Sequence, residues 1–376
     1  MTQHPRLLSP VTLRGKTLRN RIVFGAHTNN MAEGGLPLAR QGAYWLERAL
    51  GGAGMIVTEP VPAHRTGVLT RGNLAPESDD IIPHFQVITE KVKAAGSVII
   101  QQIYHGGAHG DSDLSFQPHW SPSGGPSYHD SDGSHKMTAA EIEEIFEAHA
   151  AAARRAKACG FQGVEVWAAY HSLIDQFWTP WSNTRDDKWG GSLENRTRFS
   201  RELIARIRRD CGPDFIIGLA ISYSPAYSVS LSADELCEIV SLHDSTGDVD
   251  YFTCGYGSYL EFEGIIPAFT EGEKLTTPMT ARLKTVVKHA LITSEAGVRT
   301  PENAETILSS GEADMVSIVR GQIADPHLAR KVTEGRAEDI RGCISCNQMC
   351  WGRRSRDYWI SCLVNPSVGR EWEWGG

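Results

Sequence analysis

Four cysteines near the C-terminal end of the 376-residue chain have a spacing that suits redox chemistry. Cys343, Cys346 and Cys350 form a C-x2-C-x3-C run, and Cys362 follows after eleven residues. Three thiolates on one loop and a fourth from a later segment can hold the corners of an iron–sulfur cube. Structural zinc is the competing interpretation, but zinc sites favour paired C-x2-C units and no second pair is present. The pattern therefore favours a [4Fe-4S] cluster and electron transfer.

Composition and charge restrict the class of protein. The other cysteines stand singly and are predicted to be small core residues: Cys159, Cys211, Cys237 and Cys254. No apolar secretory run opens the chain, which predicts a reducing, cytoplasmic location. The net charge of −8 argues against a nucleic-acid or anionic-membrane partner. No stretch approaches the roughly 20 apolar residues that span a bilayer. These features are typical of an enzyme that acts on small molecules.

The elements that must position these residues follow a repeating pattern. Short runs rich in Val and Ile alternate with longer segments of helical period, which is typical of strand–helix units. The predicted strands are residues 21–26, 55–61, 98–105, 164–170, 215–222, 251–257, 291–298 and 315–321. The predicted helices are residues 41–50, 81–95, 139–158, 193–210, 233–243, 279–290, 301–308 and 326–334. Thr138, Ser192, Ser232 and Thr300 mark helix starts. Eight units predict a TIM (β/α)8 barrel with its active site where the strands end.

Two segments leave the repeating pattern. The barrel is predicted to span residues 1–337, followed by a cluster-holding extension at 338–376 that is rich in tryptophan. Exposed aromatics there would suit either a homo-oligomer interface or a cover for the cluster within one chain. The connection at 106–136 has no clear period, and a connection of that length is usually a lid or a binding loop.

Residues 175–196 resemble the signature of the old yellow enzyme family of flavin mononucleotide (FMN) barrels. The resemblance rests on Asp175-Gln176-Phe177 and on the run WGGSLENR at 189–196. The cysteine spacing and the run CLVNP at 362–366 narrow it to the branch that includes 2,4-dienoyl-CoA reductase and trimethylamine dehydrogenase. It implies FMN and a [4Fe-4S] cluster as cofactors.

Members of that branch normally continue into dinucleotide-binding domains, and no G-x-G-x-x-G unit occurs here. FAD and NAD(P) are therefore expected only with a further C-terminal half. The alternative to a further half of the chain is a partner flavoprotein that exchanges electrons with the cluster.

The resemblance places the flavin ring against Ala26 and Thr28 after the first strand, Glu59 after the second and Gln102 on the third. An amide such as Gln102 can donate and accept hydrogen bonds at once, which suits the flavin pyrimidine edge. Trimethylamine dehydrogenase tethers its flavin through a cysteine where this chain has Thr28. A dissociable flavin is therefore expected.

The loops after strands seven and eight of such barrels commonly hold a phosphate with backbone N–H groups and a cation. Gly297 lies in the first loop, and Arg320 and Gly321 lie in the second. We expect Arg320 to neutralise the flavin phosphate and the glycines to let the backbone approach it. Ordinary turn glycines beside a surface arginine are the alternative interpretation.

Two positions depart from the reductase pattern. Strand four of the family ends in two polar side chains that hydrogen-bond a substrate carbonyl, whereas the frame here reads WAAYH from Trp167 to His171. An indole cannot stabilise an oxyanion as an imidazole can, which disfavours enone reduction. The arginine usually found near the flavin on strand five is replaced by Ala220. His27, His105 and His171 are the candidate replacements.

Aromatic residues gather at the predicted strand ends and beside the cysteines: Trp167, Tyr170, Trp178, Trp181, Tyr256, Tyr259 and Trp351. Aromatic faces attract alkylated ammonium groups by about 0.5–2 kcal/mol each. We assign Trp167, Tyr256 and Trp351, together with His27, to a substrate site. Core or interface packing is the alternative for any single ring.

The favoured function is oxidative N-demethylation of a small methylated amine or N-methyl amino acid. Tyr170 or His171 would accept the amine proton, and electrons would leave through the cluster. The alternative is NAD(P)H-dependent reduction of an activated C=C bond, in an enoate or a dienoyl-CoA, which the cysteine spacing favours. Ala220 motivates a third class, a non-enzymatic electron-transfer or scaffold subunit.

Overall fold

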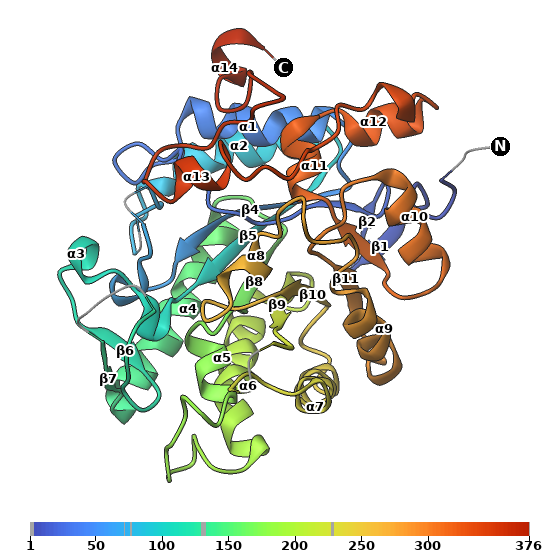
Figure 1. The fold of residues 1–376 in the computed structure, drawn as a ribbon. Helices are drawn as coiled ribbons and strands as arrows, with labels where there is room; N and C mark the ends of the chain where they lie inside the picture. Colours follow the sequence, from blue (N-terminus) through green and yellow to red (C-terminus); the bar gives the residue numbers. More distant parts are fainter. Residues whose placement is uncertain (1–3, 71, 76, 129–132, 227–228, 376) are drawn as a thin grey trace.

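Eight parallel strands close into a barrel in the order β10-β11-β12-β3-β4-β5-β8-β9. The computed structural model describes residues 4–70, 72–75, 77–128, 133–226 and 229–375. The barrel strands are β3 (Ile22–Phe24), β4 (Met55–Pro62), β5 (Val98–Tyr104), β8 (Gly163–Ala168), β9 (Ile216–Tyr223), β10 (Tyr251–Tyr256), β11 (Leu291–Ser294) and β12 (Met315–Ser317). Figure 1 shows helices arranged around these strands. The predicted TIM barrel is confirmed.

Each predicted helix is present, with ends that shift by a few residues. The helices are α1 (Ala39–Leu50), α2 (Ile81–Ala94), α4 (Ala139–Ala158), α6 (Leu193–Cys211), α7 (Ala233–Asp244), α9 (Thr277–Val286), α10 (Pro301–Ser309) and α12 (Leu328–Thr333). Thr138 and Ser232 each form a capping box with the glutamate three residues on. Ser192 and Thr300 accept from the backbone N–H three residues on. The local start signals therefore fixed where these helices begin.

Strands seven and eight are shorter than predicted. β11 ends at Ser294 and β12 at Ser317, whereas the expected ends were residues 298 and 321. Ala296 and Gly297 have φ angles of 63° and 76°, a left-handed conformation that cannot continue a strand. After β12 the chain forms α11 (Val319–Ala324) instead of extended backbone. Because β11 ends at Ser294, the residues that follow it lie at the mouth of the barrel.

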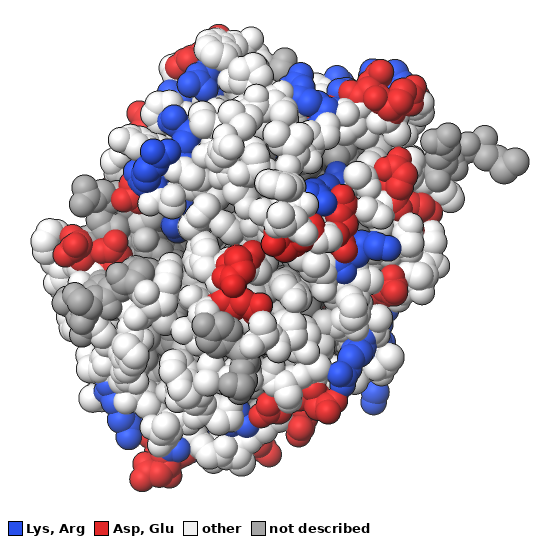
Figure 2. Space-filling model, viewed as in Figure 1, with Lys and Arg blue, Asp and Glu red and all other residues white. Residues whose placement is uncertain are grey.

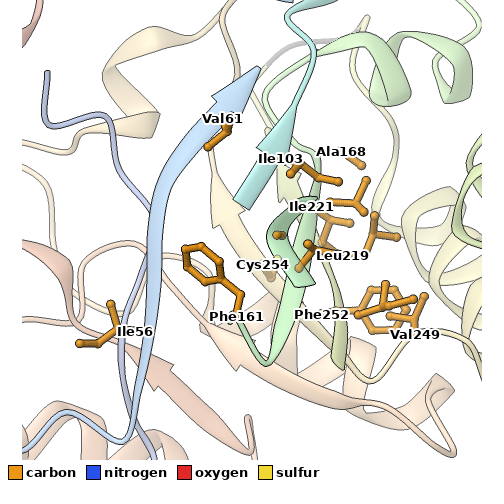
Figure 3. Close-up of a cluster of buried hydrophobic side chains, with 14 of the residues drawn as sticks. Ile56, Val61, Ile103, Phe161, Ala168, Leu219, Ile221, Val249, Phe252 and Cys254 are labelled. Atoms are coloured by element: carbon orange, nitrogen blue, oxygen red, sulfur yellow. The ribbon is translucent and has the colours of Figure 1, made fainter. Parts of the chain in front are cut away.

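Two apolar layers hold the barrel together. A hairpin of β1 (Val11–Leu13) and β2 (Lys16–Leu18) contributes Leu13 and Leu18 to a cluster with inward-facing residues such as Met55 and Tyr251. A larger cluster lies between the strands and the surrounding helices. Figure 3 shows part of it, including Phe161 and Phe252. Period-2 alternation thus sends one set of side chains into the barrel and the other toward the helices.

The long connection after β5 is more regular than expected. It contains η2 (Gly107–His109), α3 (Ser112–Ser115), β6 (His119–Ser121) and β7 (Ser134–Lys136), and β6 pairs with β7. Residues 129–132 of this connection lie outside the described residues. A further short helix, η1 (Arg65–Gly67), follows β4, and α5 (Leu173–Trp178) follows β8. α8 (Phe262–Ile265) follows β10.

The C-terminal segment lies over α1, as Figure 1 shows. It contains η3 (Ala337–Asp339), α13 (Trp351–Arg354) and α14 (Glu371–Trp374). Arg48 Nη1 on α1 donates to Glu371 Oε1 in a fully buried ion pair. Ile360 N–H donates to Asn29 O at 2.9 Å, beside the end of β3. These contacts fasten the segment to the barrel near the strand ends.

Cys159, Cys211 and Cys254 are buried, as expected of core residues, and Cys237 is half-buried. None of the helices within the described ranges is long and apolar enough to cross a membrane.

Candidate functional site

A cavity of about 550 Å³ opens over the C-terminal ends of the strands. Every barrel strand or the turn after it contributes a lining residue, and the C-terminal segment closes one side with Cys350, Trp351 and Arg354. The predicted site residues that line it are Ala26, His27, Thr28, Gln102, Trp167, Tyr170, Gly297, Arg320 and Trp351. Ala220 lines it as well. The fold therefore gathers most of the predicted flavin and substrate residues in one place.

Glu59 lies outside the cavity lining, and its contact with the flavin ring stays a prediction. Its carboxylate accepts hydrogen bonds from the backbone N–H groups of Asn29, at 2.7 Å, and Asn30, at 3.0 Å, and from the Gln41 amide. Burial raises the pKa of Glu59 to about 7. Through these hydrogen bonds Glu59 holds the turn that follows Thr28. It therefore affects the cavity indirectly, through the position of that turn.

Tyr256 and Gly321 also lie outside the lining. Thr253 and Gly255 of β10 face the cavity, so the alternation of the strand turns Tyr256 away. A Cβ on Gly321 would lie 2.6 Å from Ile318 Cγ2 and 3.1 Å from Arg299 O. Gly321 therefore allows α11 to pack closely against the preceding turn, which positions Arg320 indirectly.

None of the three histidines proposed to replace the missing arginine is a free cation in the cavity. His27 lines it, but its ring nitrogens contact Gly25 O at 2.9 Å and Tyr44 Oη at 2.7 Å. Burial lowers the pKa of His27 to about 4, so the ring is neutral near pH 7. His105 and His171 lie outside the lining. His171 Nδ1 contacts His109 Nε2 at 2.9 Å, and burial lowers the pKa of His171 to about 4.

One end of the cavity carries arginines. Arg320 Nη1 donates to Pro267 O at 2.6 Å and Asn347 Oδ1 at 2.7 Å, and Arg299 Nε donates to Glu273 at 2.9 Å. The left-handed residues Ala296 and Gly297 lie in the lining beside them. Successive backbone N–H groups in such turns, with a cation nearby, form anion-binding concavities. This end has the features expected of a phosphate site.

The four cysteines line a second, small cavity that adjoins this end. Arg320, Asn347 and Cys350 line both cavities. Within the described ranges, no group of three or more His, Cys, Asp or Glu side chains has the arrangement of a metal site. Burial raises the pKa of Cys350 and of Cys362. The tertiary structure brings Cys362 into the same small cavity as the other three cysteines.

Glu165 and Glu295 form an acidic part of the lining, which we call the acidic end. Glu165 of β8 accepts from Gln102 Nε2 at 2.7 Å and from Thr253 Oγ1 at 2.8 Å. Glu295, directly after β11, accepts from Ser317 Oγ at 2.7 Å. Burial raises the pKa of Glu165, and burial with the nearby Glu165 raises the pKa of Glu295 to about 7. These two buried carboxyl groups are chemically the most unusual groups in the cavity.

The turn after β8 holds Tyr170 in place. Tyr170 and His171 have φ angles of 61° and 65°, which are uncommon for residues with side chains. Asp175 accepts from His171 N–H at 2.7 Å, and Gln176 Nε2 donates to His171 O at 2.7 Å. Ser222 Oγ accepts from Tyr170 N–H at 2.7 Å. The Asp-Gln pair of the sequence motif therefore stabilises the strained turn that aims Tyr170 into the cavity.

Aromatic rings line the wall between the acidic and the arginine ends. Tyr259 contacts Trp167, with 6.1 Å between ring centroids, and stacks on Tyr128 at 4.9 Å. Phe262 contacts Trp351 at 4.8 Å. We call this set the aromatic wall: Tyr128, Trp167, Tyr170, Tyr259, Phe262 and Trp351, all of which line the cavity. It presents ring faces and edges to a bound molecule.

The sequence analysis did not single out Glu165 or Glu295. Glu165 interrupts an apolar strand at a position where alternation sends it inward with Trp167, and that polar residue was an available signal. Glu295 was placed inside a strand because strand seven was predicted to run to residue 298. With the correct end at Ser294, it stands at a strand terminus, where the active-site rule applies.

A (β/α)8 barrel with an anion cradle, a buried amide and an aromatic wall at its strand ends has the features of a flavin-dependent oxidoreductase. The NADH:flavin oxidoreductase / NADH oxidase family matches residues 6–339, and the chain belongs to this family.

Several characterised proteins are similar to this chain. It is 32% identical to N,N-dimethylglycine/sarcosine dehydrogenase of Chromohalobacter salexigens, over 97% of this chain and 54% of that protein. It is 34% identical to NADH oxidase of Thermoanaerobacter brockii, over 99% of this chain and 57% of that protein. The chain thus spans a little over half the length of these relatives. The structure of a 2-naphthoyl-CoA reductase complex has a TM-score of 0.94 at 29% identity, covering 99% of this chain and 58% of that one.

The cavity residues fit FMN. Gln102 uses Nε2 toward Glu165, which leaves its carbonyl oxygen as an acceptor for the pyrimidine edge. The hydroxyl of Thr28 lies in the same lining. Arg320 and the turn at Ala296 and Gly297 suit the phosphate.

Proposed function

We propose that this protein oxidatively demethylates a small methylated amine or an N-methyl amino acid. The observation that carries the proposal is the aromatic wall next to two buried carboxyl groups. Aromatic faces and unpaired carboxylates both favour an alkylated ammonium ligand. FMN, when bound, would supply the chemistry by taking a hydride from the N-methyl carbon.

The chain's own residues would bind the amine and move its proton. Tyr170 is the one of the two predicted catalytic residues that lines the cavity, and Glu295 lines it as well. Tyr170 can therefore pass a proton between the substrate nitrogen and that carboxylate, as general acid–base catalysis requires. His171 keeps only a positioning role, because it lies behind the turn. The product iminium would hydrolyse to formaldehyde and the shorter amine.

We further propose that the four cysteines hold a [4Fe-4S] cluster through which the electrons leave. Their shared cavity supports this, and Cys350 lines both that cavity and the larger one. We propose that residues 338–376 form the extension that carries the cluster, in a cytoplasmic protein. The electron acceptor would be a further flavin domain or a separate flavoprotein.

Reduction of an activated C=C bond is the second candidate. It is supported by the high similarity to the 2-naphthoyl-CoA reductase structure and by a relative named cinnamate reductase, which is 28% identical over 99% of this chain and 59% of that protein. Against it, strand β8 presents Trp167 where a carbonyl-binding side chain would be needed. The amine reaction is supported further by the relative named as a probable N-methylproline demethylase of Rhizobium meliloti, 32% identical over 97% of this chain and 54% of that protein.

The test is an anaerobic absorbance spectrum of the flavin before and after addition of dimethylglycine, N-methylproline or trimethylamine. Bleaching by one of them, followed by formaldehyde after turnover, is the expected result. If no amine bleaches the flavin, and an enoyl or dienoyl thioester reoxidises chemically reduced protein, the reductase is the correct function. An iron–sulfur absorbance that is present in the unmodified protein and lost in the Cys350→Ser variant would support the proposed cluster.

A further inference from the structure

We infer that Arg354 binds the carboxylate of the substrate, so that the substrate is an N-methyl amino acid and not an amine without an acidic group. This inference rests on the proposed demethylation and deepens it by naming the substrate class. Arg354 is the last residue of α13, in the C-terminal segment, and it lines the large cavity. The family motifs in the sequence do not identify it.

The first support is the state of the arginines that line the cavity. Arg299 is paired with Glu273, and Arg320 donates to two oxygens of neighbouring residues. Among the residues that the structure describes, the Arg354 guanidinium has neither a hydrogen bond nor an ion pair. Its N–H donors therefore have no protein acceptor, and a carboxylate accepts two such donors in a bidentate pair.

The second support is that two acidic residues near Arg354 are occupied by other donors. Burial raises the pKa of Glu59 to about 7, and Arg354 is among the weaker influences that lower it. The Glu59 carboxylate itself accepts from two backbone N–H groups. Asp357, also in the cavity lining, accepts from the Thr70 hydroxyl. The guanidinium is therefore left for an anionic group of a bound molecule.

The third support is that the guanidinium lies beside the aromatic wall. Arg354 Cζ is 5.1 Å from the centre of the Trp351 ring. Burial raises the pKa of Tyr128 to about 12, and the positive charge of Arg354 acts against that rise. Burial and Tyr128 raise the pKa of Tyr259, and Arg354 again acts against the rise. The charge thus acts on the rings that the proposed function gives to the substrate.

The backbone around Arg354 is fixed to the barrel. Asn30 Nδ2, in the segment after β3, donates to Arg354 O at 3.2 Å and to Tyr358 O at 3.4 Å. Thr70, in the segment after β4, donates to Asp357. A charged group on a fixed segment loses less freedom when a ligand binds, so more of its interaction energy appears as affinity.

A carboxylate at this position would also orient the reacting part of the substrate. In an α-amino acid a single carbon separates the carboxylate from the nitrogen, so fixing the carboxylate restricts where the N-methyl carbon can lie. Such positioning is a main source of rate acceleration in enzymes. Trimethylamine offers no group that Arg354 can bind, and we expect it to be a poor substrate.

The test is calorimetric binding of glycine betaine and choline to the FMN-loaded chain. The two ligands share a trimethylammonium group, and choline has a hydroxymethyl group in place of the carboxylate. Arg354→Met should weaken glycine betaine about 10- to 100-fold, the effect of a lost charge-assisted pair, and should not weaken choline. Arg356→Met is the matched control, because this exposed arginine two residues further on lies outside the lining. It should change neither affinity.

A second variant separates the shape of the guanidinium from its charge. Arg354→Lys keeps the charge but not the planar fork, so its affinity for glycine betaine should lie between those of the unmodified protein and Arg354→Met. Equal weakening of both ligands, unchanged binding of glycine betaine in Arg354→Met, or the same loss in Arg356→Met would overturn the inference. Weaker binding of FMN in Arg354→Met with unchanged binding of glycine betaine would place Arg354 at the flavin and overturn it too.

A measurement on the unmodified protein keeps the inference falsifiable if the variants fail to fold. Dimethylglycine should bleach the flavin at a concentration at least about tenfold lower than 2-(dimethylamino)ethanol, which lacks the carboxylate. Equal concentrations would overturn the inference.

Failure of the inference and failure of the proposed function are distinguishable. If trimethylamine bleaches the flavin as readily as dimethylglycine and Arg354→Met changes neither, demethylation stands and the carboxylate site fails. If glycine betaine depends on Arg354 but no methylated amine or amino acid bleaches the flavin, the carboxylate site stands and the demethylase proposal fails.

Discussion

The two ends of the cavity differ in charge and in what holds their charged groups. At one end Arg299 and Arg320 have polar partners, and the cysteine segment lies beside them. At the other end Glu165 and Glu295 are buried with only neutral donors. On the face shown in Figure 2, acidic side chains gather over α8, and basic side chains lie nearer α13. A molecule with an anionic group and a cationic or methylated group would be oriented by this difference.

The difference has a structural origin. The arginine end is built by elements that follow one another in the C-terminal part of the sequence, the turns after β11 and β12 and the C-terminal segment. The acidic end joins Glu165 of β8 and the strained turn at Tyr170 to Glu295, which directly follows β11. Changes that loosen the C-terminal segment should therefore affect the arginine end first. Changes inside the barrel should affect the acidic end alone.

The largest expected effect comes from breaking the anchor of the C-terminal segment. Glu371→Ala would leave Arg48 buried without its partner, at a cost of about 3–5 kcal/mol. Denaturant unfolding should show the lost free energy, and proteolysis within residues 338–375 should become faster. The control is Glu373→Ala, whose pair with Arg40 is partly exposed and should contribute below about 1 kcal/mol. Equal effects of the two variants would contradict the buried anchor.

The second effect concerns the arginine end alone. Arg320→Ala should weaken FMN binding about 10- to 100-fold, since a charge-assisted hydrogen bond contributes roughly 1.5–3 kcal/mol. Quenching of flavin fluorescence on binding measures the dissociation constant. Arg282→Ala, on the surface, should leave the constant unchanged. An unchanged constant in Arg320→Ala would place the phosphate elsewhere.

The third effect concerns the acidic end alone. Gly255→Ala should displace the Tyr170 hydroxyl and lower amine turnover about tenfold or more, because a displaced proton-transfer group loses part of its catalytic effect. FMN affinity should stay within about threefold, because the methyl group lies away from the phosphate end. Gly272→Ala has open space around it and serves as the control. A variant that loses FMN instead would show that the two ends are not independent.

Local sequence signals predicted the barrel well because they act over short distances. Capping residues such as Thr138 and Ser232 fixed helix starts, and apolar strands were recognisable at all eight positions. The ends of β11 and β12 were wrong because Val298 and Val319 look like strand residues. Left-handed backbone at Ala296 and a short helix at Val319 decide those ends, and neither has a strong local signal.

Predicted site residues line the cavity where residue type and strand position coincide, as for Gln102, Arg320 and Trp167. They lie outside the lining where orientation decides, as for Glu59 and Tyr256. Side chains alternate between the two faces of a strand, so a shift of one residue in the assumed alternation moves a side chain from the cavity to the outside. Sequence position alone could not fix that phase.

The sequence by itself determined the alternation of strands and helices, the flavin-family motif and the chemistry that four closely spaced thiols can offer, because each depends on residue type and short-range spacing. Only the tertiary structure decided that Glu165, Glu295 and Tyr170 line one cavity. It also decided that Cys362 reaches the other cysteines. These relations join residues up to 130 positions apart, such as Glu165 and Glu295, and closure of the barrel is what brings them together.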